Sequence, residues 1–478
     1  MNNVSRRRFL EQSMLATAAA VVPLTPTSTL AVTRRSASAN EIIRVGVIGV
    51  RGRGRAHVGA FKQSPDTEVV AICDPDEGVI EGAMNAVPGA TYYRDIRKLL
   101  EDQSIDAISI ATPNHWHSLA AIWALQAGKH VYVEKPISHN LREGRKVVEA
   151  ARKYGKVVQH GTQARSNGAT REAIAWLHDG GLGQLSIARA LCYKRRESIG
   201  KVIETQQPPT TLDYDLWTGP AQLLPLRRKQ LHYDWHWVFN TGNGDIGNQG
   251  VHQMDIARWG LDRSEFPRRI TSCGGRVGYD DDGDTPNSLI SVYDYGQQQL
   301  IFEVRGLKTA DYRTAHVGVI FHCEHGYLVS TSGYGKVVAF DLQGNIIKTF
   351  DGDGNHFQNF IDAVKNDNPS GVNASSLEGH RSSALCHLGN ISYLLGAQRT
   401  MSEIDAPFGE DEAGNESFDR LQQHLIDNDL LPEQTALTIG STLTFDSSTE
   451  QFTGHRAAEA NALLTRPGRE PFVVPQHV

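Results

Sequence analysis

The chain has 478 residues, of which 40% are hydrophobic and 21% charged, and its net charge is −6 at pH 7. This composition indicates a globular protein of two domains, and the acidic balance gives no support for nucleic-acid binding. The cysteines have no metal-ligand spacing, so we expect buried thiols rather than disulfides. They are Cys73, Cys192, Cys273, Cys323 and Cys386.

Residues 1–39 have the pattern of an export signal. The segment Ser5-Arg6-Arg7-Arg8-Phe9-Leu10 precedes an uncharged stretch from Gln12 to Thr33, and small residues at Ala37-Ser38-Ala39 offer a cleavage site. This pattern resembles the bacterial twin-arginine signal, which exports folded proteins. The apolar core is too short to span a bilayer comfortably, so we expect a periplasmic protein without a stable membrane anchor. An uncleaved anchor and a disordered basic arm are the alternatives.

A glycine-rich turn follows the first buried-strand pattern, residues 42–48. The turn is Gly49-Val50-Arg51-Gly52-Arg53-Gly54, and it opens a helix-like segment. Such a turn lets the backbone approach a pyrophosphate, while the helix N-terminus supplies N–H donors. It departs from G-x-G-x-x-G because Arg51 takes the middle position, where a guanidinium would lie near the phosphates. We therefore expect Gly49, Val50, Arg51, Gly52 and Gly54 to bind a dinucleotide.

The next strand, Glu68–Cys73, ends at Asp74. An acid at this position accepts hydrogen bonds from an adenosine ribose and repels a 2′-phosphate. The predicted cofactor is therefore NAD, with NADP possible. Strands alternating with helices continue to about residue 165, which predicts a Rossmann domain with a parallel, doubly wound sheet over residues 40–165.

Two further strand ends of this domain carry polar residues. Ala107–Ala111 leads into the loop Thr112-Pro113-Asn114-His115-Trp116-His117, and His130–Val133 leads into Glu134-Lys135-Pro136. Ligands collect at the carboxyl ends of the strands in an open α/β sheet. The residues that we expect beside the cofactor are Thr112, Pro113, Asn114, His117, Glu134 and Lys135.

From about Ser186 the pattern changes to extended, alternating runs without long crossover helices. This predicts an α+β domain over residues 166–400 with a large, mostly antiparallel, open sheet. Helical patterns are expected at Gly250–Trp259 and at His356–Lys365, the second returning toward the first domain. Residues 401–478 form an extension with a helical stretch near Phe418–Asp427, which covers a partner subunit or the active site or is loosely attached.

Together these motifs and Gly250-Val251-His252-Gln253-Met254-Asp255 resemble the glucose–fructose oxidoreductase/inositol dehydrogenase/MocA family. The resemblance covers about residues 42–395. It implies a Rossmann domain, a second domain whose open sheet face commonly mediates homo-oligomer formation, and oxidation or reduction of a secondary alcohol. The expected partner is a small, carbohydrate-like substrate.

The resemblance also assigns roles at the site. Lys135 would bind the reacting hydroxyl and relay its proton, and His252 would be the general acid/base, since an imidazole that titrates near neutrality can take a proton as hydride leaves. The acid that the family usually carries four residues before this histidine is replaced by Asn248. Asp245 is a possible substitute partner for His252.

The segment His232-Tyr233-Asp234-Trp235-His236-Trp237 is dense in aromatic and hydrogen-bonding groups. With Asp245 and Asn248 it predicts a carbohydrate pocket that includes His236, or else a loop packed against the domain. Its histidines lack the spacing of a metal site, so none is predicted.

Three functions stay open at this point. The first is an NAD(P)-dependent oxidoreductase acting on a sugar, polyol or glycoside. The second is a glycosidase that retains NAD and acts by transient oxidation and elimination, with Tyr193 or Tyr233 as an extra base. The third is a non-catalytic nucleotide- or sugar-binding protein.

Overall fold

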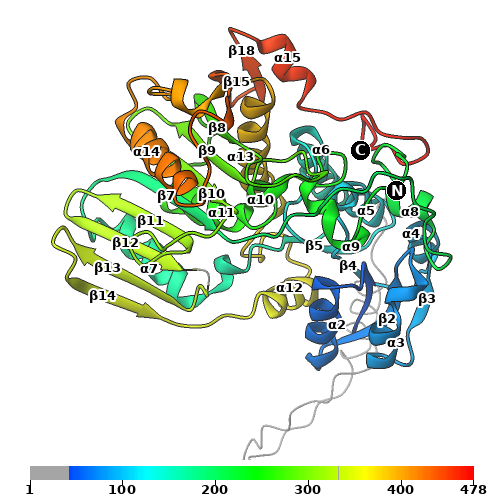
Figure 1. Cartoon of the computed structure of the whole chain (residues 1–478). Coiled ribbons are helices and arrows are strands. Elements are labelled where there is room, and N and C mark those ends of the chain that lie inside the picture. Colours follow the sequence, from blue (N-terminus) through cyan, green and yellow to red (C-terminus); the bar gives the residue numbers. More distant parts are fainter. Residues whose placement is uncertain (1–41, 332) are drawn as a thin grey trace, which may run out of the picture. The chain divides into compact units, whose positions relative to one another are not determined.

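The computed structural model describes residues 42–331 and 333–478. The expected export signal, residues 1–39, lies outside this part of the chain. The described residues form two sheets, which can be followed in Figure 1. Among these residues, none of the helices combines the length and apolar character that a bilayer crossing requires.

The first domain contains a six-stranded sheet in the order β3-β2-β1-β4-β5-β6, with every pairing parallel. Its strands are β1 (Ile43–Ile48), β2 (Thr67–Cys73), β3 (Thr91–Tyr93), β4 (Ala107–Ile110), β5 (His130–Val133) and β6 (Val158–His160). Its helices are α2 (Arg53–Gln63), η1 (Glu77–Val79), α3 (Glu81–Ala86), α4 (Ile96–Glu101), α5 (Asn114–Gln126) and α6 (Leu141–Tyr154). The strand order reverses beside β1, which creates the crevice where such folds bind nucleotides. The predicted doubly wound sheet is confirmed.

Local sequence explains where these elements begin and end. The side chain of Asn140 caps α6 by accepting a hydrogen bond from the backbone N–H of Glu143, and Gly155 ends the helix at a φ of 60°. Helix α5 begins at Asn114, directly after Pro113, so residues 114–117 are its first helical turn rather than the expected loop. Proline is common at such a helix start because it removes a donor that would be unpaired there.

The second domain contains a 12-stranded sheet in the order β14-β13-β12-β11-β7-β10-β9-β8-β16-β15, with β17 and β18 branching from β8. Its strands are β7 (Leu185–Tyr193), β8 (Arg269–Gly275), β9 (Ser288–Asp294), β10 (Gln299–Arg305), β11 (Val317–Cys323), β12 (Gly326–Thr331), β13 (Lys336–Asp341), β14 (Ile346–Asp351), β15 (Ala397–Thr400), β16 (Ala436–Ile439), β17 (Leu443–Asp446) and β18 (Gln451–Thr453). All pairings are antiparallel except that of β7 with β10. The predicted, mostly antiparallel sheet is confirmed.

Helices cover the two faces of this sheet unequally. The helices that follow β6 in the chain are η2 (Gln163–Ser166), α7 (Gly168–His178), α8 (Tyr214–Thr218), α9 (Leu231–Asp234), η3 (Trp235–Trp237), α10 (Gly244–Gly247), α11 (Gly250–Gly260), α12 (His356–Lys365), α13 (Ser376–Leu394), η4 (Met401–Glu403), α14 (Glu412–Ile426) and α15 (Ala457–Ala462). Alternate residues of β7 such as Ala188 and Ala190 share a core with α7, α11 and α13. The opposite face meets α14 through Phe418 and Leu421, and farther along it carries the aromatic cluster of Tyr193.

Helix α13 was not predicted from the sequence, which indicated only that long crossover helices are absent from this domain. It has 19 residues and is buried on almost all sides, including small polar positions such as Ser382 and Ser392. A helix that packs serine and glycine among its buried residues has no apolar stripe, so its sequence shows no helical period. A search for apolar residues at helical spacing therefore misses this helix.

Two later segments return to the first domain. Phe357 in α12 stacks on Tyr132 with ring centroids 4.7 Å apart, and Phe360 joins the same core. Phe472 packs with Trp116 and Trp123. Helix α12 is thus confirmed where expected. The segment 401–478 is not loosely attached, because β16 pairs with β8 and Phe472 enters the first core.

Candidate active site

A cavity of about 430 Å³ opens at the carboxyl ends of β1, β2, β4 and β5. It brings together most of the residues that the sequence predicts for the site. Those in its lining are Gly49, Arg51, Gly52, Asp74, Thr112, Pro113, Asn114, His117, Glu134, Lys135, His236, Asn248 and His252. Val50, Gly54 and Asp245 are outside this lining. The cavity therefore joins the end of the first sheet to the start of α11.

The glycine-rich turn fits a dinucleotide. A Cβ on Gly54 would lie 1.8 Å from the carbonyl oxygen of Gly49, so only glycine allows the helix to start this close to the strand. Asp74 accepts hydrogen bonds from the backbone N–H groups of Val50, at 3.0 Å, and Asp76, at 3.1 Å. Burial raises the pKa of Asp74 to about 6, although these hydrogen bonds oppose the shift. Turn and acid thus have the geometry that binds a pyrophosphate and a ribose.

Glu134 is a buried carboxylate at the floor of the cavity. Its Oε1 accepts hydrogen bonds from Arg53 Nε at 2.7 Å and from His57 Nε2 at 3.0 Å. Burial opposes its ionisation, but the His57 hydrogen bond and the Arg53 charge outweigh it and hold the Glu134 pKa well below its usual range. Because an ionised carboxylate only accepts, His57 carries its proton on Nε2. Nδ1 then accepts from Ser109 Oγ at 2.7 Å.

Lys135 follows Glu134 and lies between the two domains. Its Nζ donates to the backbone carbonyl of Asn248 at 3.0 Å and to the Asn248 side-chain oxygen at 3.1 Å. Burial lowers the pKa of Lys135, and the nearby Glu134 carboxylate opposes this shift. The peptide bond between Lys135 and Pro136 is cis. His117 connects this turn to β4, since its ring nitrogens lie 2.5 Å from the Pro136 oxygen and 2.8 Å from the Thr112 oxygen.

His252 lies in the first turn of α11 and its ring borders the same cavity. Its Nδ1 is buried without a hydrogen-bond partner. Burial, followed by the charge of Lys135, lowers the pKa of His252 to about 3. The imidazole is therefore neutral at physiological pH, and it is a weaker base than the imidazole titrating near neutrality that the sequence leads us to expect.

The sequence-based pairing of Asp245 with His252 is wrong. Both oxygens of Asp245 instead accept from Arg196, at 2.7 and 2.8 Å. Arg196 lies over the ring of Trp237, 5.0 Å from its centroid. Spacing along the chain could not show this, because Arg196 comes from the segment after β7. Asp245 thus fixes an arginine in the second domain.

Tyr193 is also excluded as a base in the cavity. It lies on the opposite sheet face, where its hydroxyl donates to Glu303 at 2.5 Å. Burial and the Glu303 charge raise its pKa. Tyr233, by contrast, borders the cavity.

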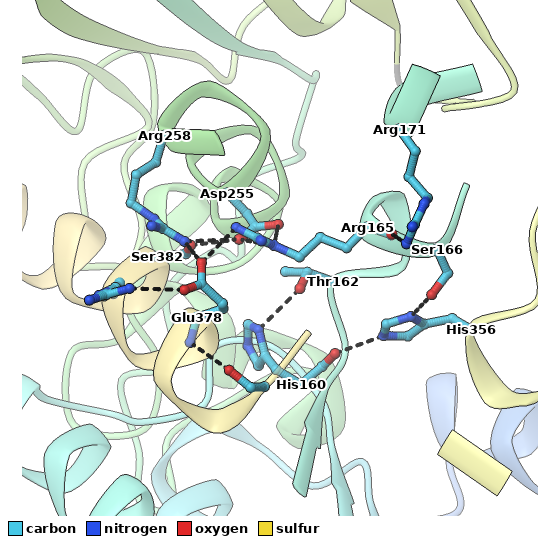
Figure 2. A network of polar contacts seen from close by, with 12 residues as sticks. His160, Thr162, Arg165, Ser166, Arg171, Asp255, Arg258, His356, Glu378 and Ser382 are labelled. Atoms are coloured by element: carbon cyan, nitrogen blue, oxygen red, sulfur yellow. Dashed lines mark hydrogen bonds and ion pairs between the residues drawn. The ribbon is translucent and has the colours of Figure 1, made fainter. Parts of the chain in front are cut away.

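A buried polar network holds α11 in place (Figure 2). Figure 2 shows Arg165 and Arg258 pointing toward Asp255 and Glu378. Arg165 Nε lies 2.8 and 3.0 Å from the two oxygens of Asp255, and Ser382 Oγ donates to Asp255 at 2.6 Å. Asp255 is one helical turn after His252, so the network fixes the helix that carries the imidazole.

The aromatic segment predicted for substrate binding spans the cavity from the second domain to the first. His232 Nε2 lies 2.7 Å from an oxygen of Asp76, and Arg51 donates to the His232 carbonyl at 3.2 Å. The rings of Trp235 and His236 stack with centroids 3.6 Å apart, and both border the cavity. Burial lowers the pKa of His236 to about 3. This arrangement offers flat apolar surfaces beside hydrogen-bonding groups.

The sequence did not identify the residues that surround Glu134. Arg53, in the glycine-rich turn, and His57 are four residues apart on α2, and that spacing was the available signal. The sequence contains no signal for Ser109 and Gln163, because only the fold brings Ser109 to His57 and Gln163 to Glu134. Among the described residues, no group of three or more His, Cys, Asp or Glu side chains could hold a metal ion.

Two family models match the chain. An oxidoreductase family with an NAD-binding Rossmann fold matches residues 43–162, and the C-terminal α/β domain of this oxidoreductase family matches residues 185–426. Among solved structures, the WlbA dehydrogenase from Bordetella pertussis in complex with NADH and UDP-GlcNAcA is similar at 19% identity and a TM-score of 0.55. That likeness covers 73% of this chain and 95% of the dehydrogenase. An oxidoreductase from Thermotoga maritima has 20% identity and a TM-score of 0.56, covering 73% and 95% of the two chains.

Sequence relatives include glycosidases. An alpha-N-acetylgalactosaminidase from Shewanella oneidensis is 32% identical over 177 residues, which are 33% of this chain and 39% of that relative. A glycosyl hydrolase family 109 protein from Shewanella baltica matches with the same identity and coverage. The matched segment therefore spans well under half of either relative.

Proposed function

Because the chain belongs to the Gfo/Idh/MocA oxidoreductase family, we propose that it transfers hydride between NAD and a secondary alcohol of a sugar, polyol or glycoside. One observation carries this proposal. The cavity that contains the glycine-rich turn and Asp74 also contains Lys135 and His252. The residues that we propose bind the nucleotide and the two residues that we propose transfer the proton thus line the same cavity.

The residues that would hold NAD are the turn at residues 49–54, for the pyrophosphate, and Asp74, for the adenosine ribose. NAD, when bound, supplies the hydride acceptor or donor. Glu134 keeps its negative charge beside this space, with Arg53 and His57 fixing its orientation. Lys135 and His252 act on the proton of the substrate hydroxyl.

We place the substrate hydroxyl between Lys135 Nζ and the His252 ring. The Lys135 ammonium lowers the pKa of the hydroxyl, and the neutral imidazole accepts its proton as the hydride leaves. Asn248 holds Nζ through two oxygens without adding a negative charge. The stacked Trp235 and His236 rings would face the C–H surface of a sugar.

This proposal is tested with Lys135→Ala and His252→Ala. Each variant should lower kcat by about 10²–10⁴-fold, because proton transfer assisted by a positioned side chain contributes that much. NAD binding, measured by fluorescence titration, should persist in His252→Ala, whose ring borders the substrate side. Unchanged kcat in both variants would refute the assigned roles, and failure of the parent protein to bind NAD would refute the cofactor.

The glycosidase relatives favour a second candidate function. In it, the same pair would take and later return the hydroxyl proton while hydride passes to bound NAD and back, and between these two steps the glycosidic bond would be eliminated and water would add. This mechanism releases a free sugar without net NADH. Following both NADH and product by mass spectrometry across sugars, polyols and glycosides separates the two functions.

We further propose that residues 1–39 are a twin-arginine signal and that the protein acts in the periplasm. The motif Ser5-Arg6-Arg7-Arg8-Phe9-Leu10 supports this proposal. Fused to a reporter, the segment should lose export after Arg6→Lys and Arg7→Lys together. Equal export of the changed fusion would contradict the assignment.

We also propose that the chain forms a homo-oligomer through the open face and edge of the large sheet. Ile346 and Ile347 are 65% and 50% exposed on β14, and Leu342 is 66% exposed beside them. Light scattering should give a mass of at least two chains, and Ile346→Glu should reduce it. A monomeric parent protein would refute this proposal.

A further inference from the structure

We propose that a second cavity, on the other side of the first turn of α5, binds a pyranose unit of an uncharged glycan or glycoside. This cavity has a volume of about 790 Å³. Asn114 and Trp116 border the candidate active site, whereas His115 between them borders the second cavity. The site is thus separate from the place of hydride transfer, and the inference does not depend on that function.

Two buried asparagines in the lining of this cavity carry hydrogen-bonding atoms without a partner. Asn243 is 1% exposed and Asn390 is 3% exposed. The Asn243 side-chain oxygen accepts from Arg466 Nη2 at 3.2 Å, and Asn390 Nδ2 donates to the Asn243 carbonyl at 3.2 Å. Asn243 Nδ2 and Asn390 Oδ1 are left buried without a partner. Such atoms are unfavourable unless a ligand or water pairs with them.

The leftover atoms match hydroxyl groups. One is an amide donor and the other an amide acceptor, and a hydroxyl both accepts and donates a hydrogen bond. A carboxylate could satisfy only the donor, and an ammonium only the acceptor. Neighbouring hydroxyls of a sugar ring could satisfy both.

The charges around the cavity also favour an uncharged ligand. Arg466 donates to the Phe239 carbonyl. Burial lowers the pKa of Arg466 to about 10, and the nearby charges of Glu143 and Asp284 oppose this shift. Arg142 and Lys146 add positive charge to the lining, but Lys146 pairs with Glu149 at 2.7 Å. Both signs therefore face the cavity. An ionic ligand would meet a like charge on some wall.

Apolar side chains complete the lining. Leu224, Leu394 and Val473 are 46%, 45% and 37% exposed, and all three border this cavity. Large exposed apolar groups gathered around polar ones commonly mark binding sites. A pyranose combines an apolar C–H surface with hydroxyls. It is therefore complementary to this lining.

The test uses saturation-transfer difference NMR on the full protein with NAD added. The probes are methyl pyranosides of glucose, galactose, mannose and N-acetylgalactosamine, with galacturonate as the charged counterpart. At least one pyranoside should bind in the Lys135→Met variant, which alters the candidate active site alone. Asn390→Leu should weaken this binding about tenfold, the equivalent of roughly 1.4 kcal/mol from a lost buried hydrogen bond.

Two variants at exposed positions distinguish a lost ligand contact from misfolding of the Asn390→Leu protein. Leu394→Ser changes an exposed side chain of the cavity, and Leu431→Ser changes an exposed leucine outside its lining. The first should weaken pyranoside binding and the second should not. The proposal is overturned if no pyranoside signal depends on Leu394 or Asn390, or if galacturonate binds this site as tightly as the pyranosides.

Discussion

Lys135 Nζ donates to two oxygens of Asn248, the backbone carbonyl at 3.0 Å and the side-chain amide oxygen at 3.1 Å. A neutral amide therefore occupies the position where the family resemblance leads us to expect a carboxylate. The Asn248 side chain accepts from the lysine, and Nδ1 of His252 has no hydrogen-bond partner. The buried ammonium therefore donates to neutral oxygens, while the charges of Glu134 and Asp245 act on its pKa without an ion pair to it.

Replacing Asn248 by aspartate should move the pH dependence of the reaction. A carboxylate at this distance raises the pKa of Lys135 and of His252, by about 1–3 units for a close opposite charge. Since the proton acceptor works in its unprotonated form, activity should then be lost at a higher pH as the solution is acidified. The measurement is kcat against pH. Asn248→Ala, which adds no charge, should lower kcat without this upward movement, and an unmoved acid limb in Asn248→Asp would contradict the electrostatic argument.

Gly54→Ala should abolish NAD binding and destabilise the protein. Its Cβ would meet the Gly49 oxygen at 1.8 Å, whereas a Cβ on Gly59, in the same helix, would meet nothing within 4 Å. Gly59→Ala should instead stabilise the protein, by up to about 1 kcal/mol from helix propensity. NAD titration and thermal unfolding of both variants check this contrast. Equal effects of the two substitutions would show that the turn is not tight.

Affinity for NAD should fall as the pH falls through about 6. The pKa of Asp74 is raised to about 6 by burial, so the carboxylate that accepts from the ribose becomes protonated below that pH. The Kd for NAD should then rise by up to about tenfold per pH unit. Asp74→Asn should remove this dependence and reduce the preference for NAD over NADP. A Kd that does not change with pH in the parent protein would contradict the assignment.

Asp255→Ala should destabilise the fold by about 3–5 kcal/mol, because it removes one of the two carboxylates that pair with the buried guanidinium of Arg165. The matched control is Glu101→Ala, which breaks the Lys98 ion pair at the surface, where the two side chains are 67% and 64% exposed. That change should cost less than about 1 kcal/mol. Chemical denaturation of both variants gives the comparison, and a small effect of Asp255→Ala would show that Glu378 alone, or water, satisfies Arg165.

The first domain could be predicted closely because its signals are local. The strands that run into Asp74 and Lys135, β2 and β5, are parallel members of one sheet, so their carboxyl ends lie along the same edge and border one cavity. The order of motifs along the chain was enough to place these residues together. The spacing of the glycines predicted the turn at residues 49–54, because this signal is also local in the sequence.

The second half of the site depends on how the two domains pack, which no local pattern encodes. The contact between Asn248 and Lys135 joins α10 to the end of β5. The partner of Asp245 is Arg196, a residue on a segment without regular structure. Helix α13 lacks an apolar stripe because it is buried on nearly all sides. These features follow from tertiary packing alone.

The core of the first domain is closed by residues that leave the ribosome long after it. Phe357 and Phe360 cover Tyr132, and Phe472 covers Trp116, hundreds of residues later in the chain. The Rossmann sheet thus cannot finish its core during synthesis until the second domain has been made. Nascent chains arrested near residue 165 should therefore be digested by a protease that the full chain resists. We propose that the protein is exported folded. Because the core of the nucleotide-binding domain is complete only after these late residues have packed into it, a complete nucleotide-binding domain indicates that the whole chain has folded.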